Sequence, residues 1–181
     1  HRFWSYIAIH QRHLESFALR DVIDNETIGR NGCVNCHAFC QNSPARMSLQ
    51  VRSPSYGTPL MIVRTGEVRY VDVRHEPQSS PAAYQSWHPN GRLIAFSQNK
   101  LSPFEHAAGE TPDVWDNDSD LAVYDLDANV VWQVPQLAAP ERRETWPAWS
   151  ADGRALYFCS APQRPFAKFL EVRYDLMRVR F

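Results

Sequence analysis

Apolar and polar positions alternate along most of the chain after its first fifty residues, and this pattern predicts paired β-strands. Two hairpins follow it: residues 60–73, which turn at Thr65-Gly66, and residues 121–134, which turn at residues 125–129. A period of two residues on both sides of a turn with glycine or asparagine is typical of antiparallel hairpins. No long segment of this part has the period of a helix, so we expect a mostly antiparallel β protein.

The second half of the chain repeats a strand–turn–strand unit. Residues 86–97 read SWHPNGRLIAFS, and residues 148–160 read AWSADGRALYFCS. At an offset of 62 residues, Trp87 aligns with Trp149 and Phe96 with Phe158. Asn-Gly and Asp-Gly supply the positive φ angles that tight hairpin turns require. A recurring unit of this kind with a tryptophan anchor is typical of a β-propeller blade.

We therefore expect an all-β fold, a partial β-propeller of about two to three blades. The expected division is residues 1–56, an N-terminal strand and a short helical or loop segment with a cysteine motif, and residues 57–181, the blades. A complete propeller has about four to eight blades. The remaining blades would come from the same longer protein or from a partner chain.

The composition is that of an ordinary globular domain. The chain has 181 residues, of which 44% are hydrophobic and 22% charged, and a formal net charge of −1. This balance gives no electrostatic reason to expect nucleic acid as a partner. No apolar run approaches the ~20 residues of a membrane-spanning helix, so we expect no transmembrane segment.

Candidate chemistry is concentrated in one short stretch. Three of the four cysteines, Cys33, Cys36 and Cys40, lie within eight residues of each other, and Cys159 lies far from them. Such clustering suits a site better than a framework of disulfides. Cys33-Val-Asn-Cys36-His37 has the CxxCH spacing of a c-type haem, in which two cysteines form thioethers and the histidine binds iron. On a helical turn both sulfurs would lie on one side.

Other uses of this stretch stay open. Cys33, Cys36, His37 and Cys40 are all competent zinc ligands, but the sequence lacks a second, separated ligand pair. Their spacing is not that of the usual ferredoxin run. A structural or disulfide role of the cysteines is also open, as are the individual roles of Cys40 and Cys159.

Three residues are candidates for the second axial ligand of a haem iron. Met47 lies ten residues after His37 and follows a turn at Pro44, which would fold the chain back across the haem. A methionine ligand raises the reduction potential, although methionine is also a common core residue. His10 and His13, in the expected N-terminal strand, are the alternatives.

Two further patterns have ordinary interpretations. Asp116, Asp118 and Asp120 are spaced as in a calcium loop, but the glycine and the distal glutamate of such loops are missing, so we expect a solvated loop before a strand. The tryptophans of the repeats, Trp146 among them, resemble a binding cage, yet their repeated placement favours a role in the blade cores.

Three segments carry a resemblance to a known family. Residues 86–97, 120–137 and 144–161 look like TolB-type propeller repeats. The order of motifs is most similar to a group of bacterial extracytoplasmic proteins that have a CxxCH segment just ahead of such repeats. In that group the motif continues into Asn-x-Pro-x-x-Met and then a Gly-Thr strand opening, matched here by residues 42–47 and by residues 57–58.

The resemblance covers nearly the whole chain. Residues 171–181 resemble the start of the next blade in that group. One position departs from it, because the group tends to carry histidine where this chain has Gln50. The resemblance implies a periplasmic or otherwise extracytoplasmic bacterial protein.

These features together predict a propeller protein with one covalent haem c on Cys33 and Cys36, with His37 and Met47 as iron ligands. We expect electron transfer with a redox partner protein or within a larger complex, rather than catalysis. Two alternatives remain. One is a non-redox propeller that binds protein or glycan partners, with a structural cysteine turn. The other is a haem enzyme with an open sixth position.

Overall fold

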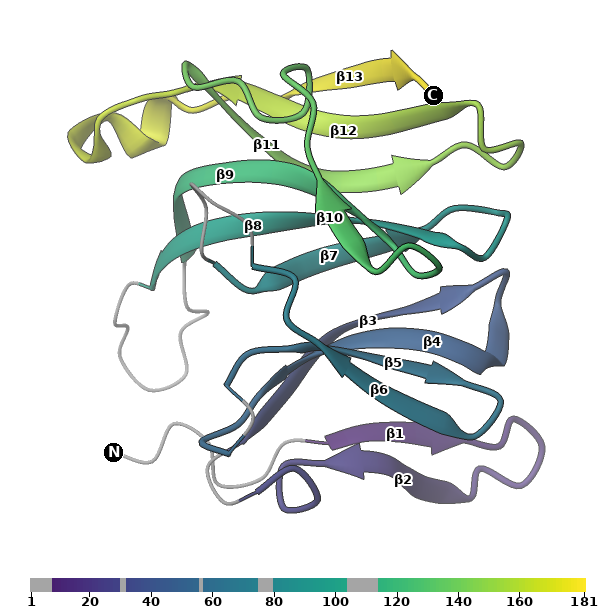
Figure 1. Cartoon of the computed structure of the whole chain (residues 1–181). Coiled ribbons are helices and arrows are strands. Elements are labelled where there is room, and N and C mark those ends of the chain that lie inside the picture. The colour runs from purple at the N-terminus through teal and green to yellow at the C-terminus, as the bar shows by residue number, and fades with distance from the viewer. Residues whose placement is uncertain (1–7, 30–31, 56, 75–79, 104–113) are drawn as a thin grey trace.

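The computed structural model describes residues 8–29, 32–55, 57–74, 80–103 and 114–181. These residues form strands in four antiparallel sheets, which follow one another in chain order and lie face to face (Figure 1). The single short 3-10 helix, η1 (Phe166–Glu171), precedes the last strand. The prediction of a mostly antiparallel β protein is confirmed.

Each sheet is built from consecutive strands. The first sheet contains β1 (Ala8–Arg12) and β2 (Leu19–Asp24). The second contains β3 (Cys33–Cys40), β4 (Ser43–Arg52), β5 (Leu60–Arg64) and β6 (Glu67–Val71). The third contains β7 (Ala82–Trp87), β8 (Leu93–Pro103), β9 (Val114–Asp125) and β10 (Val130–Trp132). The fourth contains β11 (Arg142–Trp149), β12 (Ala155–Pro162) and β13 (Asp175–Arg180).

Both predicted hairpins are present. Strands β5 and β6 are joined at Thr65-Gly66, where φ is 48° and 88° as a tight hairpin turn requires. Strands β9 and β10 pair from Val130 opposite Asp125, and Asn129 in their turn has a φ of 56°.

The hydrophobic core is divided among the spaces between neighbouring sheets. One cluster, with Ile23, Val34 and Leu49, lies between the first and second sheets. The central cluster joins the second and third sheets, and a third cluster joins the third and fourth. Each sheet is therefore held by apolar contacts on its faces, as expected for blades that follow one another.

The first strands of the second, third and fourth sheets lie on a common side. Strands β3, β7 and β11 each form the edge of their sheet, and β7 contacts both of the others. This arrangement of meandering sheets with adjacent first strands is consistent with a β-propeller-like fold.

The tryptophans of the repeats differ in their surroundings. Trp87 is 8% exposed, and its Nε1 donates a hydrogen bond of 3.1 Å to Ser48 Oγ of the second sheet. Trp149 packs partly against the cluster between the third and fourth sheets. Trp146 is 46% exposed, so the expectation that it belongs to a blade core is wrong. Its backbone has a φ of 53°, which turns the side chain out of the regular strand alternation.

Two expectations about strand boundaries need correction. Strand β13 pairs with β12 as the third strand of its own sheet, and does not open a further blade. Residues 116–120 lie within β9 rather than in a loop, because they continue the ladder with β8.

The expected division at residues 56 and 57 falls within the second sheet, because β3 and β4 precede it and β5 and β6 follow it. The cysteine motif is thus part of the second sheet. Within the described residues, no helix has both the length and the apolar character needed to cross a membrane.

Candidate cofactor site

The cysteine motif lies in strand β3, at the edge of the second sheet. The sequence predicted a short helical or loop segment here, and the structure has an extended strand instead. Cys33 pairs opposite Arg52 of β4, and the buried Val34 follows it into the core towards the first sheet. These ladder and core contacts replace the local hydrogen bonds that a helical turn would have made.

A β-bulge brings the two cysteines to the same side of the strand. In a regular strand, residues three apart point to opposite faces. Here Asn35 pairs with Gln50 and Ala38 with Ser48, so the two residues between them oppose a single residue of β4. Cys36 is the first of these two and has a φ of 45°. The bulge therefore places both sulfur atoms on one side of the chain, which a helical turn was expected to do.

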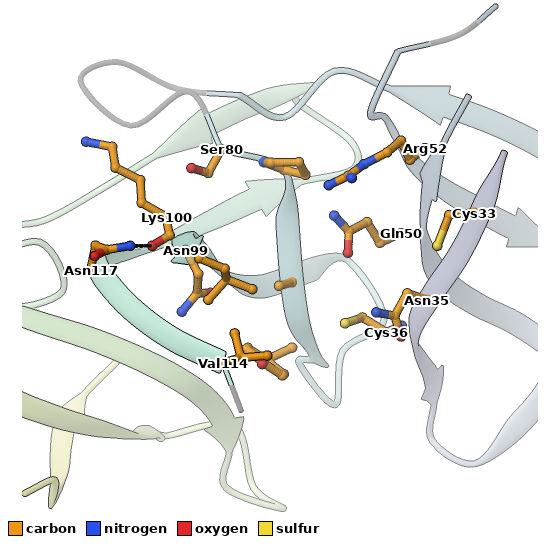
Figure 2. Close-up of a pocket in the computed structure, with 14 residues that line it drawn as sticks. Cys33, Asn35, Cys36, Gln50, Arg52, Ser80, Asn99, Lys100, Val114 and Asn117 are labelled. Atoms are coloured by element: carbon orange, nitrogen blue, oxygen red, sulfur yellow. Dashed lines mark hydrogen bonds between the residues drawn. The ribbon is translucent and has the colours of Figure 1, made fainter. Parts of the chain in front are cut away.

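Cys33 and Cys36 line one cavity of about 710 Å³ between the second and third sheets (Figure 2). One wall comes from β3 and β4, and the facing wall from the third sheet, with Asn99 on β8 and Asn117 on β9. This volume is within the range of about 300–1,000 Å³ that is usual for cofactor and small-molecule sites.

The cavity has an apolar and a hydrogen-bonding part. Its apolar surface includes Ala83, Tyr84 and Leu101, whereas four amide side chains supply donors and acceptors: Asn35, Gln50, Asn99 and Asn117. Asn117 Nδ2 also donates to the backbone oxygen of Lys100, at 2.9 Å, which fixes β9 against β8 (Figure 2).

The charges at the cavity are positive. Lys100 Nζ lies 3.2 Å from Asp118 Oδ2, so its charge is partly balanced. Arg52 forms no ion pair with any residue that the structure describes. A guanidinium on the wall of a cavity suits a carboxylate or phosphate group of a ligand.

Both motif cysteines are free thiols. Burial raises the pKa of Cys33, and the nearby Cys36 adds to this effect while Arg52 opposes it. Cys33 is therefore a neutral thiol at neutral pH and a poor thiolate nucleophile.

His37, the predicted proximal ligand, does not line the cavity. Its side chain is exposed, and its ring lies 5.6 Å from the ring of Phe39 in an edge-to-face arrangement. Phe39 in turn lies opposite Met47 in the ladder with β4. The imidazole is thus on the side of β3 that faces away from the two thiols.

Met47, the predicted distal ligand, is 5% exposed and belongs to the cluster between the first and second sheets. The neighbouring Ser48 points the other way, towards Trp87 of the third sheet. Because side chains alternate along β4, Met47 lies on the sheet face opposite the cavity, whereas Gln50 lines the cavity. An iron ligand at Met47 would have to leave this core.

The alternative distal ligands lie on the first sheet. His10 is on β1, with its Nδ1 2.6 Å from Asp21 Oδ1. His13 lies in the turn after β1, where its Nδ1 accepts a hydrogen bond from the backbone N–H of Ser16 at 3.2 Å. Neither residue lines the cavity.

The zinc alternative is not assembled in this geometry. Among the residues that the structure describes, no three His, Cys, Asp or Glu side chains gather in a way that could hold a metal ion. Cys40 is 1% exposed in the cluster between the second and third sheets, and Cys159 lies on β12.

The acidic residues of β9 do not form a calcium loop. Asp118 pairs with Lys100 and accepts a hydrogen bond of 2.9 Å from Gln163 Nε2. Asp116 Oδ2 accepts a bond of 2.8 Å from Asn99, and burial raises the pKa of its carboxyl. Both carboxylates thus interact with side chains of the protein within a strand, and among the described residues they form no cluster that could hold a metal ion.

Most cavity residues were missed by sequence reasoning. Asn99, Asn117 and Arg52 reach the cavity only because two sheets stack, and no local pattern indicates this. Tyr84 could have been found, since it precedes Trp87 by three residues, as Trp146 precedes Trp149. Extending the repeat alignment by those three positions pairs Tyr84 with Trp146.

Comparisons with known proteins assign neither a family nor a function to the chain. No protein-family model matches the chain. No curated protein matches it either. Among solved structures, one similar chain is an Agrobacterium tumefaciens protein assigned as TolB, with 16% sequence identity and a TM-score of 0.32. That match covers 90% of this chain and 62% of the other, so this chain spans under two thirds of the length of the solved protein.

The donor set fits haem attachment in one respect and not in another. Two free thiols with CxxCH spacing share a cavity of suitable volume and positive charge. The imidazole of His37 is next to them in sequence but points to the other side of the strand. The two thiols therefore share one cavity, whereas the candidate axial ligands do not line it.

Proposed function

We propose that this chain is the haem-bearing part of an extracytoplasmic β-propeller protein that carries electrons. Cys33 and Cys36 would hold one haem c, and His37 would bind its iron. One observation carries the proposal: a β-bulge turns Cys36 to the cavity that Cys33 also lines, so both thiols of the motif face one space. A bound haem would supply a reversible one-electron change at its iron.

The walls of the cavity support an amphipathic occupant. Tyr84 and Leu101 offer apolar surface, and the guanidinium of Arg52 suits the carboxylates that a haem carries at one edge. Burial between two sheets would also limit access of water, which is one of the ways a protein tunes the potential of a haem.

The same geometry argues against a disulfide between the two thiols. Strand residues three apart have Cα atoms roughly 10 Å apart before the shortening caused by a bulge. A disulfide needs a Cα separation of about 4.4–6.8 Å. A larger group that bridges Cys33 and Cys36 requires less change of the backbone.

Ligation by His37 requires a local change that the edge position allows. Strand β3 pairs with β4 on one side only, and Cys36-His37 is the bulged pair in which the ladder is interrupted. A rotation of the backbone at these two residues would bring the imidazole towards the cavity without opening the rest of the sheet. For Met47 the corresponding change would empty a core position, so we expect it at greater cost.

The expected location and partners of the protein rest on covalent haem attachment and on the order of the CxxCH segment and the propeller-type repeats along the chain. We expect a bacterial periplasmic or other extracytoplasmic location, and a redox partner protein or a larger complex to which electrons pass. We also expect the remaining blades to come from the same longer protein or a partner chain.

A second candidate function has one observation in its favour. Four amide side chains, one tyrosine and two cations line the cavity, a mixture that suits hydrogen bonding to a glycan or peptide. In that case the protein would be a non-redox binding propeller and the cysteine segment would be structural.

Expression with a haem-attachment system separates the two candidates. We expect the purified chain to keep a visible haem band after denaturation, because thioether bonds survive unfolding. The variant with Cys33→Ala and Cys36→Ala should lose that band. Cys159→Ala, which removes a free cysteine outside the motif, should keep it. A colourless parent chain would exclude the haem proposal and favour the binding propeller.

A further inference from the structure

The bulge at Cys36 has equivalents in the first strands of the next two sheets. In β7 the ladder with β8 shifts between Ala83 and Ser86, and in β11 the ladder with β12 shifts between Thr145 and Ala148. In each strand two residues oppose one. The first of the two has a positive φ: 45° at Cys36, 49° at Tyr84 and 53° at Trp146.

None of these three positions is glycine, although this backbone conformation favours glycine. A residue with a β-carbon is strained in the left-handed region, and such strain is found preferentially where side chains have a function. The same strained bulge recurs in three neighbouring strands. We infer that each bulge directs one side chain to an equivalent position at the first strand of its sheet.

The three side chains form a continuous row. Cys36 and Tyr84 line the same cavity. Burial raises the pKa of the Tyr84 phenol, and the charge of a Cys36 thiolate adds to this effect, so the two groups are electrostatic neighbours. The Tyr84 ring lies 5.4 Å from the Trp146 ring, which in turn lies 5.5 Å from the Tyr174 ring.

The first position of the row therefore carries a thiol where the other two carry aromatic rings. A planar group bonded at Cys36 would lie beside the aromatic ring at the equivalent position of the next blade. The ring of Tyr84 packs against the ring of Trp146 at an interplanar angle of 56°. Arg52, which forms no ion pair with a described residue, supplies positive charge on the same cavity wall as Cys33.

We propose that Tyr84 is the aromatic contact residue for a planar, anionic tetrapyrrole bound in this cavity. Trp146 acts as a positioning residue that holds the Tyr84 ring, and Arg52 takes a carboxylate of the ligand. The inference rests on the proposed function for the identity of the ligand. The aromatic contact itself needs no thioether bond, so it can be tested without one.

The test uses the chain with Cys33→Ala and Cys36→Ala, which cannot attach haem covalently. We expect saturable, one-to-one binding of ferric protoporphyrin IX in a titration followed by Soret absorbance. Tyr84→Ala should weaken it about tenfold, because an aromatic contact and its buried area are lost. Tyr84→Phe should bind the porphyrin with the same affinity as the chain that carries only the two cysteine substitutions. Tyr84→Leu keeps apolar bulk for folding and should still lose most of this affinity.

Tyr70, which lies on β6 outside the cavity, provides the matched control. Tyr70→Ala should leave binding unchanged. All of these variants are made in the chain with Cys33→Ala and Cys36→Ala. The proposed contact would be overturned if Tyr84→Ala left the affinity of that chain unchanged, or if Tyr70→Ala lowered the affinity as much as Tyr84→Ala does.

Two ligands test the role of Arg52. Arg52→Ala should weaken binding of metal-free protoporphyrin IX, and should leave binding of its dimethyl ester unchanged, because the ester has no carboxylate. The same loss for both ligands would remove Arg52 from the proposal.

The outcomes separate the inference from the function on which it rests. A parent chain without covalent haem overturns the proposed function, while Tyr84-dependent binding in the alanine variant still supports the aromatic contact. Covalent loading of the parent together with Tyr84-independent binding overturns the contact and leaves the proposed function intact. In the loaded chain, Tyr84→Ala should also change the Soret circular dichroism, and Tyr84→Phe should not.

Discussion

At the scale of single residues, the side of the strand on which a motif residue lies decides whether its side chain reaches the cavity. Cys33 and Cys36 face the cavity, whereas His37 and Met47 face away from it. The sequence spacing predicted that the thiols would lie together, and they do, although by a bulge rather than a helical turn. It could not indicate the side of Met47, because that is set by the register between β3, β4 and β5.

Position 50 rather than position 47 is the place on β4 from which a side chain reaches the cavity. In the haem-loaded chain, we expect Met47→Leu to leave the visible spectrum unchanged, because leucine conserves core volume and Met47 points away. Gln50→His should change the spectrum to that of an iron with two nitrogen ligands, with a lower midpoint potential. Loss of a methionine-type spectrum in Met47→Leu, together with no effect of Gln50→His, would reverse this assignment.

Glu144 links stability to pH. It is 1% exposed, and its Oε1 accepts a hydrogen bond of 3.2 Å from Ser160. Its Oε2 has no hydrogen-bond partner among the residues that the structure describes. Burial raises the pKa of this carboxyl to about 7 from an ordinary value of 4.5. The folded state thus holds a proton that the unfolded state releases, so stability falls as pH rises from about 4.5 to about 7 and then levels off.

Glu144→Gln should remove this slope, and should stabilise the chain at pH 8 by up to about 3 kcal/mol. Urea denaturation at several pH values between about 5 and 8 measures the effect. Glu141→Gln, at an exposed residue of the same segment, should keep the slope of the parent chain. Identical slopes in the parent and Glu144→Gln would show that this carboxyl is not the source.

At the scale of elements, alternation and turn residues were sufficient to predict the hairpins. Thr65-Gly66 and Asn129 specify their turns locally, through positive φ angles that few residues adopt readily. The bulges in β3, β7 and β11 escaped prediction, because none carries glycine at its first position. The repeat alignment contained them in part, in the equal spacing of Tyr84 from Trp87 and of Trp146 from Trp149.

The Trp87 indole is expected to join the third sheet to the second through its hydrogen bond to Ser48. Trp87→Phe and Ser48→Ala should show a coupling energy of about 1 kcal/mol in a double-mutant cycle, as for a buried hydrogen bond. Trp149→Phe removes an equivalent indole whose Nε1 has no hydrogen-bond partner in the described parts of the chain, so it should lose packing only. Urea midpoints of these variants measure the difference, and a coupling energy near zero would contradict the inter-sheet role.

At the scale of the whole molecule, the fold class followed from the sequence and the site followed only in part. Period-two alternation and a repeated Trp–turn–strand unit are local signals, and the stacked antiparallel sheets agree with them. The cavity arises where two sheets meet, so its amides, Tyr84 and Arg52 come from segments that no local pattern connects. The CxxCH motif in the sequence therefore predicted which thiols form the site. The other cavity residues depend on how the sheets stack, which the sequence did not indicate.

The central claim is that Cys33 and Cys36 together hold one haem covalently. Its most direct test is the intact mass of the chain expressed with a haem-attachment system, followed by mapping of the modified peptide. We predict an added mass of one haem, on a peptide that contains both cysteines, and no addition in the variant with Cys33→Ala and Cys36→Ala. An unmodified parent chain, or a haem on any other cysteine, would contradict the claim.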